Sequence, residues 1–379
     1  MLLWLSIEST RSDMNTKADD DEVMSAFAAA QDAELQGDLP MALEHARRGV
    51  ELATHLADGA HAAAHGLLML GKLQCDRGAY QEATSLYEQC KQVLADAPTD
   101  STLAEHTPYQ YSCAVRGVAL VHQRTGRYEE ARVVLLEALR TAEGRLAVDS
   151  LELGNCLNDL GAIYKFLGHF DKAQGAYERS LEACDLEYGE QPSELGATLC
   201  HNLGGLAHAR GDFANGEPFA RRGVGIREQL VGKHHPDVAS DLVAWASILD
   251  GLGRHTESEP LYQRARDIIA KHAGETSYEM AVCLNNEAAA LHSSGEYPRA
   301  ESAYLHALEI HSSLGIDHPD VGTIYSNLAE LSRSQGHHEQ AATHYQHAME
   351  LLETQLGLEH PKTAACRKAL AEYRESRLT

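Results

Sequence analysis

The sequence predicts an all-α protein, a right-handed α-solenoid of about eight helical hairpins closed by a C-terminal capping helix. Three observations support this fold class. One pattern of residues occurs twice between Ala281 and Pro361, and the two copies are 41 to 42 residues apart. Apolar and small residues recur at three- and four-residue steps on both sides of a glycine in each copy, and no segment alternates with a period of two. A self-similar period of this length indicates stacked supersecondary units.

Each copy is predicted to be a pair of antiparallel helices joined at a glycine. Gly295 and Gly336 occupy that place, and small residues such as Ala288 let the two helices approach closely. After the second helix, Gly315 is predicted to adopt a left-handed C-terminal cap, and a His-Pro step then begins the next helix. Because one hairpin cannot bury both of its faces, its neighbours must supply the remaining contacts.

The hairpin glycine recurs eight times along the chain, at Gly37, Gly78, Gly126, Gly168, Gly211, Gly253, Gly295 and Gly336. The predicted units span 23–56, 64–97, 112–145, 154–187, 197–230, 239–272, 281–314 and 322–355. Residues 1–21 show no helical period and are predicted to be a disordered tail or an over-annotated start. The solenoid then covers 22–359, and a helix over 360–376 caps it, since a solenoid must end on an element with one polar face.

One interval between hairpin glycines is irregular. Gly78 and Gly126 are 48 residues apart, whereas the other intervals are 41 to 43 residues. The additional residues fall in 96–106, which include Pro98, and Thr107 and Pro108 are expected to start the next helix. This long turn is predicted to be either a hinge or a slightly longer rigid loop.

The composition excludes several function classes. Acidic residues outnumber basic ones 56 to 32, and the net charge of −24 disfavours nucleic acid or an anionic membrane as the main partner. The eight cysteines form no Cys-x-x-Cys pair and read as buried small hydrophobes, which favours a reducing cytoplasm. No apolar run approaches the length of a membrane span, and the apolar start over residues 1–7 is a poor signal peptide.

A family resemblance is carried by the fourth unit. Gly161, Tyr164, Gly168, Ala173 and Tyr177 resemble the tetratricopeptide repeat. The 42-residue period and the linkers over 232–238 and 315–321 resemble the kinesin-light-chain subtype, and the composition resembles a free-standing bacterial member. The heptad coiled coil of a motor subunit is absent from the sequence.

Two units depart from the repeat pattern. In the fifth, Cys200, Gly216, Ala220 and Gly223 replace larger or more helix-favouring residues, so we expect a weaker hairpin. In the seventh, Glu287 stands where a packing leucine is usual. A buried carboxylate must be paired or neutral, so either a cation reaches Glu287 or the helix is rotated there.

The resemblance implies that the first helices of successive hairpins line a concave groove. The polar residues expected to face that groove are Asn158, Asp159, Lys165, His201, Asn202, His208, Asn285, Asn286, His292, Ser326, Asn327 and Arg333. A column of asparagines can bond to the backbone of an extended peptide, so we predict an interaction scaffold that binds a protein or peptide partner. The alternative is a merely solvated polar face, and the sequence leaves open whether the peptide is acidic or basic.

Other functions have weaker support. His337, His338, His344 and His347 form the one metal-like group, but no carboxylate or thiolate completes a site in register, so no metal or other cofactor is predicted. The sequence has no Gly-rich phosphate loop, nucleophile elbow or His-Glu-x-x-His motif, so no enzymatic activity is expected. A peptide-sensing regulator of a separate enzyme or transcription factor remains the rival to a scaffold.

Overall fold

The computed structural model describes residues 14–35, 37–56, 59–97, 107–145, 151–189, 191–314, 319–358 and 360–376. All regular secondary structure in these ranges is helical, in seventeen helices, which confirms the predicted fold class of eight hairpins and a capping helix. The helices are α2 (Met14–Leu35), α3 (Leu39–Ala53), α4 (Ala60–Asp76), α5 (Tyr80–Ala95), α6 (Thr107–Arg124), α7 (Tyr128–Arg145), α8 (Leu151–Phe166), α9 (Phe170–Tyr188), α10 (Glu194–Arg210), α11 (Phe213–Val231), α12 (Pro236–Gly251), α13 (His255–His272), α14 (Tyr278–Ser293), α15 (Tyr297–Leu314), α16 (Pro319–Ser334), α17 (His338–Leu356) and α18 (Pro361–Ser376).

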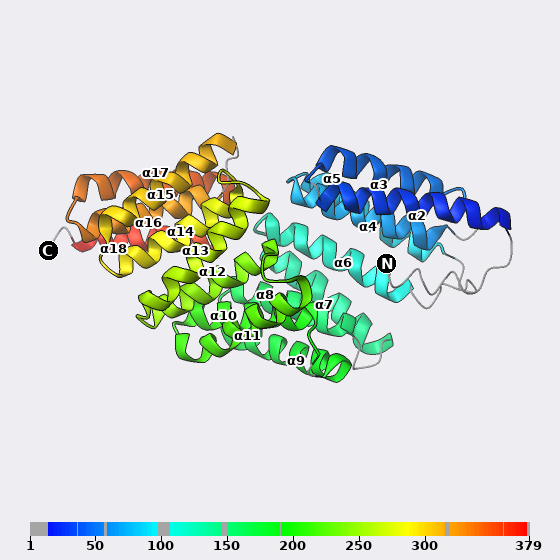
Figure 1. Cartoon of the computed structure of the whole chain (residues 1–379), viewed down its shortest axis with the longest axis horizontal. Coiled ribbons are helices and arrows are strands. Elements are labelled where there is room, and N and C mark those ends of the chain that lie inside the picture. Colours follow the sequence, from blue (N-terminus) through cyan, green and yellow to red (C-terminus); the bar gives the residue numbers. More distant parts are fainter. Residues whose placement is uncertain are drawn as a thin grey trace. The chain divides into compact units, whose positions relative to one another are not determined.

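The chain divides into two compact units at Val148 and Asp149. The first unit contains α2 to α7, and the second contains α8 to α18 (Figure 1). A hinge was one of the two alternatives for the long turn between α5 and α6. The division does not fall there, because α5 and α6 pack against each other. Residues 98–106 of the turn lie outside the described residues.

The eight hairpin glycines all adopt the left-handed backbone conformation, with φ between 72° and 83°. At Gly336 the next amide, of His337, donates to the carbonyl of Ser332 over 2.8 Å, and Glu296 after Gly295 donates to Leu291 in the same way. These bonds satisfy carbonyls at the end of the first helix, and glycine reaches this φ without steric cost. The predicted turns are therefore confirmed, whereas Gly315 lies outside the described residues.

The His-Pro steps start helices as predicted. Pro236 and Pro361 are the first residues of α12 and α18, and Pro319 is the first residue of α16. In two of these steps the histidine caps the helix, because Nδ1 of His235 and of His360 accepts the amide of the residue two positions later, over 3.3 and 3.1 Å. The cap satisfies an amide that the first turn of a helix leaves without an intrahelical partner.

The start of the first hairpin was predicted too late. Helix α2 begins at Met14, whereas the tail without helical structure was expected to extend to residue 21. Extending an existing helix by one residue costs little compared with nucleating it, so a helix can run beyond its apolar periodic part. Residues 1–13 lie outside the described residues.

The cores of the fourth, sixth, seventh and eighth hairpins each contain a buried tyrosine. Tyr177, Tyr262, Tyr304 and Tyr345 are all fully buried. Gly161 faces the ring of Tyr177, where an added Cβ would come within 2.6 Å of a ring carbon. Seven of the eight cysteines are also buried, as predicted, and Cys113 is half-buried. No helix among the described residues combines the length and apolar character needed to cross a membrane.

The small residues of the fifth hairpin have a packing role. A Cβ added to Gly216 would lie 2.8 Å from Ala207 Cβ, and one added to Gly223 would lie 3.2 Å from Cys200 Cβ. Helices α10 and α11 therefore approach each other closely at these glycines. Whether this hairpin is weaker than its neighbours stays a prediction.

Candidate functional site

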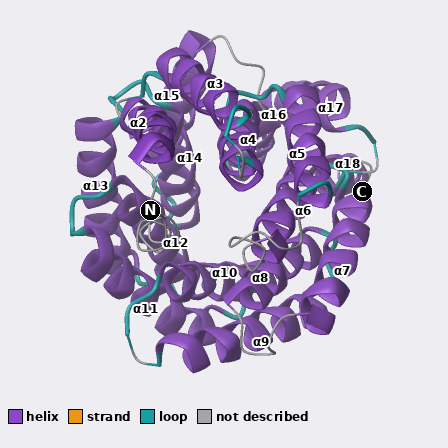
Figure 2. Ribbon diagram, turned by 90° about the vertical axis from the view of Figure 1, so that its right-hand side faces the viewer, coloured by secondary structure: helices purple, strands orange, loops and turns teal. Residues whose placement is uncertain are grey.

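The candidate site is the inner face of the second unit, which we define as the side formed by the first helices of its hairpins, α8, α10, α12, α14 and α16. In Figure 2 α8, α10 and α12 lie inside the curve of this unit and α9, α11 and α13 lie outside it. Successive first helices contact one another directly. All twelve predicted groove residues belong to α8, α10, α14 and α16.

Four of the predicted asparagines form two rungs between neighbouring first helices. Nδ2 of Asn202 on α10 donates to Oδ1 of Asn158 on α8 over 2.8 Å. Nδ2 of Asn327 on α16 donates to Oδ1 of Asn285 on α14 over 3.0 Å. Asn158 is buried, with 9% exposure, and also donates to Asp159. Part of the hydrogen bonding of these side chains therefore joins neighbouring repeats.

Asn286 does not form such a rung, although it occupies the same position as Asn202 and Asn327. The residue across from it in the preceding repeat is Val243, which offers no side-chain acceptor. Nδ2 of Asn286 instead donates to the carbonyl of Val282, one turn earlier in its own helix, over 2.8 Å. Ser326 interacts with Cys366 on α18 and so contributes to the contact with the capping helix.

A second column lies three residues before each hairpin glycine, at Lys165, His208, Asp250, His292 and Arg333. Three members of this column have partners within the protein. Asp250 accepts from His255 Nδ1 over 3.0 Å, His292 Nε2 lies 3.0 Å from Ser334 Oγ, and Arg333 Nε donates to Glu330 over 2.8 Å. Lys165 and His208 differ from these three, since they have no hydrogen-bond or ion-pair partner among the described residues.

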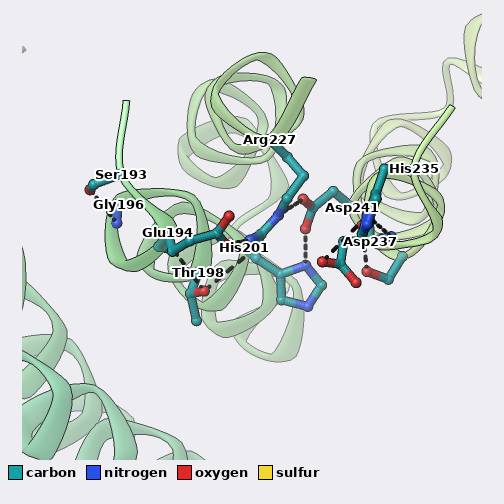
Figure 3. A network of polar contacts seen from close by, with 10 residues as sticks. Ser193, Glu194, Gly196, Thr198, His201, Arg227, His235, Asp237 and Asp241 are labelled. Carbon is teal, nitrogen blue, oxygen red and sulfur yellow. Dashed lines mark hydrogen bonds and ion pairs between the residues drawn. The ribbon is translucent and has the colours of Figure 1, made fainter. Parts of the chain in front are cut away.

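A network of charged groups joins α10, α11 and α12 near the inner face (Figure 3). Oδ2 of Asp241 accepts from Arg227 Nε over 3.2 Å, and Oδ1 lies 2.8 Å from His201 Nδ1. Asp241 and Arg227 are buried, with 3% and 8% exposure, and Arg227 also binds the exposed Glu194. Because a carboxylate only accepts, His201 holds its proton on Nδ1, and its Nε2 is the nitrogen left for other contacts.

Glu287 is buried and paired, which answers the question raised by the sequence. Its side-chain oxygens accept from Arg266 Nη1 over 3.0 and 2.7 Å, so a cation does reach it. Burial raises the pKa of this carboxyl group above its usual range, and the arginine charges oppose that effect. A cavity of about 120 Å³ lies beside it between α12, α13, α14 and α15, and Arg299 binds Glu259 and Glu296 at its edge.

The histidine-rich stretch over 337–347 makes aromatic contacts. The ring of Tyr325 stacks on His344 and His347, with centroids 6.0 and 5.4 Å apart, and His338 lies against Tyr373. In the part of the chain that the structure describes, no group of three or more histidine, cysteine, aspartate or glutamate residues is placed to hold a metal ion.

Sequence reasoning missed the two buried members of the charged network. Asp241 lies among the apolar residues at 238, 239, 242 and 243, as Glu287 lies among apolar residues of its own helix, and this signal could have identified it. Arg227 could not be found in this way, since an arginine on a second helix is ordinary in the sequence. Only the packing of α11 against α12 brings it to Asp241.

Comparisons with known proteins agree with this architecture. Sequence profiles of the tetratricopeptide repeat match residues 67–102, 111–185, 194–271, 242–313, 279–354 and 320–377. The human "Clustered mitochondria protein homolog" is 27% identical over 194 residues, which cover 49% of this chain and 14% of that protein. "Protein KINESIN LIGHT CHAIN-RELATED 1" of Arabidopsis thaliana is 25% identical over 229 residues, which cover 59% of this chain and 36% of that protein. The chain thus spans much less than two thirds of either relative.

Solved structures share the fold at lower sequence identity. A Rap protein complexed with competence and sporulation factor has a TM-score of 0.62 and 14% identity, with 97% of this chain and 91% of that chain covered. The apo form of the quorum sensor NprR from B. thuringiensis has a TM-score of 0.59 and 14% identity, with 92% and 91% covered. The profiles match well over half of the sequence in the register of the hairpins, and the similarity to a kinesin light chain-related protein agrees with the predicted subtype. The chain therefore belongs to the tetratricopeptide repeat family.

Proposed function

We propose that this protein is an interaction scaffold whose inner face binds an extended segment of a partner protein. The observation that carries the proposal is the set of asparagine amides at equivalent positions of neighbouring first helices. Each amide can make several hydrogen bonds, and the rung between two asparagines uses one donor and one acceptor. The remaining capacity, present on α8, α10, α14 and α16 and interrupted at α12, suits the backbone of an extended peptide.

The solved structures with this fold support a peptide ligand. Two of them are complexes with a peptide or factor, one Rap protein with the competence and sporulation factor and the Rap conjugation gene regulator of plasmid pLS20 with the Phr* peptide. Those ligands belong to those proteins. For this chain the fold similarity supports an inner face that accepts a polypeptide, and it equally suits a peptide-sensing regulator of a separate protein.

The test begins with partners captured from the native host and identified by mass spectrometry, followed by calorimetry with the bound segment made as a peptide. Replacing Asn202 and Asn327 together with alanine should weaken that peptide by about 1 to 3 kcal/mol, which is several-fold to over a hundredfold in Kd. Asn215→Ala is the matched control, because Asn215 is exposed on the second helix α11 and bonds only to Asp212 among the described residues. If the folded double variant binds the peptide as tightly as wild type, the binding site does not lie on the inner face.

The scaffold and the regulator make different predictions for the partner. A scaffold holds its peptide segment without changing the activity of the captured protein. In a regulator, a free peptide would displace or recruit the captured enzyme or transcription factor. Competition between the synthetic peptide and the intact partner, with the activity of the partner measured in parallel, distinguishes the two.

A further inference from the structure

The cavity beside Glu287 brings together two departures from the repeat pattern. Glu287 stands where Leu160 and Leu203 stand in the fourth and fifth hairpins. Asp250 lies three residues before its hairpin glycine, where the other hairpins of the second unit carry lysine, histidine or arginine. The two residues belong to different first helices, α14 and α12, yet both line the same cavity of about 120 Å³. Two separate departures from the repeat therefore place carboxylates in one cavity.

This cavity lies between the sixth and seventh hairpins, close to their turns. Six of its twelve lining residues belong to the second helices α13 and α15, so it extends away from the inner face. A cavity of about 150 Å³ holds a molecule as large as benzene, so this one has room for a planar group of the size of a guanidinium. Ala290 and Leu291 form an apolar part of its wall, against which methylene groups can pack.

The carboxylate of Asp250 is buried without a lysine or arginine partner among the described residues. Its side chain is 8% exposed. Its oxygens accept from the hydroxyl groups of Ser258 and Tyr262 and from Nδ1 of His255. Buried charges in proteins are normally paired with an opposite charge. The hydrogen bonds hold this carboxylate in place, but they do not supply a permanent positive charge.

The other three carboxylates at the cavity share two arginines. Arg266 binds Glu287, whereas Arg299 binds both Glu259 and Glu296 at the edge of the cavity. The side chains of this second group are 46% to 67% exposed, and exposed ion pairs contribute little, so Arg299 can turn aside at a small cost. Four carboxylates thus face two arginines and one histidine, and the cavity has an excess of negative charge.

We propose that this cavity binds an organic cation, the guanidinium or ammonium group at the end of a flexible apolar chain. The cationic group would donate hydrogen bonds to Asp250 and Glu287, and its methylene groups would pack on Ala290 and Leu291. Its source is either an arginine or lysine side chain of a partner protein or a free polyamine. The site is separate from the segment proposed to bind the inner face, so the two proposals are tested independently.

The first experiment titrates the full chain with four small probes by ligand-observed NMR. They are N-acetyl-arginine amide, N-acetyl-lysine amide, N-acetyl-citrulline amide and spermidine. Citrulline has nearly the shape of arginine but no charge, so it is the matched control for the guanidinium. Because charge-assisted hydrogen bonds are lost, we expect the citrulline amide to bind about ten- to a hundredfold more weakly than the arginine amide.

The second experiment repeats the titration with Asp250→Asn and Glu287→Gln. Each variant removes one charge and keeps the shape of the side chain, so each should weaken the arginine amide by about tenfold or more. Glu330→Gln is the matched control. Its carboxylate accepts from the hydroxyl of Tyr345 as Asp250 accepts from Tyr262, but Glu330 does not line the cavity. Its loss should leave the affinity unchanged.

Ala290→Met tests the space rather than the charge. Methionine narrows the cavity while every charged group stays, so this variant should also weaken the arginine amide by about tenfold or more. Circular dichroism checks the folding of each variant, and if Asp250→Asn does not fold, Ala290→Met and the citrulline amide decide the question.

Three results would overturn the proposal. The first is the absence of binding to wild type, and the second is equal affinity for the arginine and citrulline amides. The third is undiminished binding by Ala290→Met, or an equal loss in Glu330→Gln and Asp250→Asn, because the cations would then bind the acidic surface without a defined site. If the site exists, tighter binding of spermidine than of either charged amide identifies a polyamine as the source, and the reverse order identifies a side chain.

Discussion

Two neighbouring interfaces of the solenoid each bury a carboxylate, but they pair it in different surroundings. One lies between the fifth and sixth repeats, and the other lies between the sixth and seventh repeats. Each buries a carboxylate on a first helix and pairs it with an arginine from the preceding second helix, Asp241 with Arg227 and Glu287 with Arg266. The side chain of Arg227 is 10% exposed, whereas the side chain of Arg266 is 30% exposed. Asp241 also binds His201, and Arg227 also binds Glu194. Asp241 and Arg227 are thus both buried and belong to a larger network, whereas Glu287 is buried but its partner Arg266 is partly exposed.

This difference governs what the loss of each carboxylate should cost. Removing one partner of a buried ion pair leaves an uncompensated charge, and the penalty depends on how far that charge can reach water. The same dependence on burial and partner applies to the hydrogen bonds of Asn202 and Asn286, and to the histidine caps at the starts of α12 and α18. Variants at these positions test it, and we expect the greatest loss of stability from Asp241→Ala.

Asp241→Ala should lower the free energy of unfolding by about 3 to 5 kcal/mol, because it leaves the buried guanidinium of Arg227 without its buried partner. Urea denaturation followed by circular dichroism measures the change. Glu194→Ala is the control, since Glu194 is 62% exposed in its side chain and should contribute less than about 1 kcal/mol. Equal losses from the two variants would show that burial does not govern this network.

Glu287→Ala should cost less, about 1 to 2 kcal/mol, because Arg266 can turn toward solvent once its partner is gone. Glu287→Leu extends the test, since leucine is the residue usual at this position of the repeat. Leucine fills the buried space that alanine would leave empty while Arg266 turns toward solvent, so we expect Glu287→Leu to be more stable than Glu287→Ala and close to wild type. A loss above about 3 kcal/mol for Glu287→Leu would mean that the ion pair is required for packing.

Asn202→Ala and Asn286→Ala should differ although the two residues occupy the same repeat position. Asn202→Ala removes the rung to the buried Asn158 and should cost about 0.5 to 1.5 kcal/mol. Asn286 bonds only to its own helix among the described contacts, and alanine favours helix, so Asn286→Ala should be neutral or slightly stabilising. Thermal melts of both variants in the same buffer measure the difference. Equal melting temperatures for Asn202→Ala and Asn286→Ala would contradict this prediction.

The two histidine caps predict a small difference in pH dependence. Burial, and then the charge of Lys362, lowers the pKa of His360 below 6.5 in the folded protein. The folded state therefore resists protonation, so the stabilisation from His360 is present above pH 6.5 and is lost as the pH falls through its folded pKa. His360→Asn keeps a capping side chain and should reduce the loss of stability between about pH 7.5 and 5.5 by a fraction of a kcal/mol.

His235→Asn is the matched control for that experiment. His235 caps α12 through the same contact, but its side chain is 38% exposed. The slope of melting temperature against pH should therefore change less for His235→Asn than for His360→Asn. An identical change in both variants would place the pH sensitivity elsewhere in the chain.

The local sequence was sufficient to predict the hairpins, their turns and the starts of several helices. The glycine register predicted left-handed turns at eight positions, and all eight have positive φ. The His-Pro steps at Pro236 and Pro361 begin helices as expected. These features depend on backbone geometry and apolar periodicity within a few residues, so neighbouring residues contain the information.

Which polar residues meet depends instead on how the helices pack. Asn202 and Asn286 look identical in the sequence, yet the residue across the interface is Asn158 for one and Val243 for the other. The partners of Asp241 and Glu287, and the approach of Lys165 Nζ to Gly205, follow in the same way from the packing of different helices. Such pairs are up to 44 residues apart, and their energies depend on burial and on the partner, which periodicity does not specify.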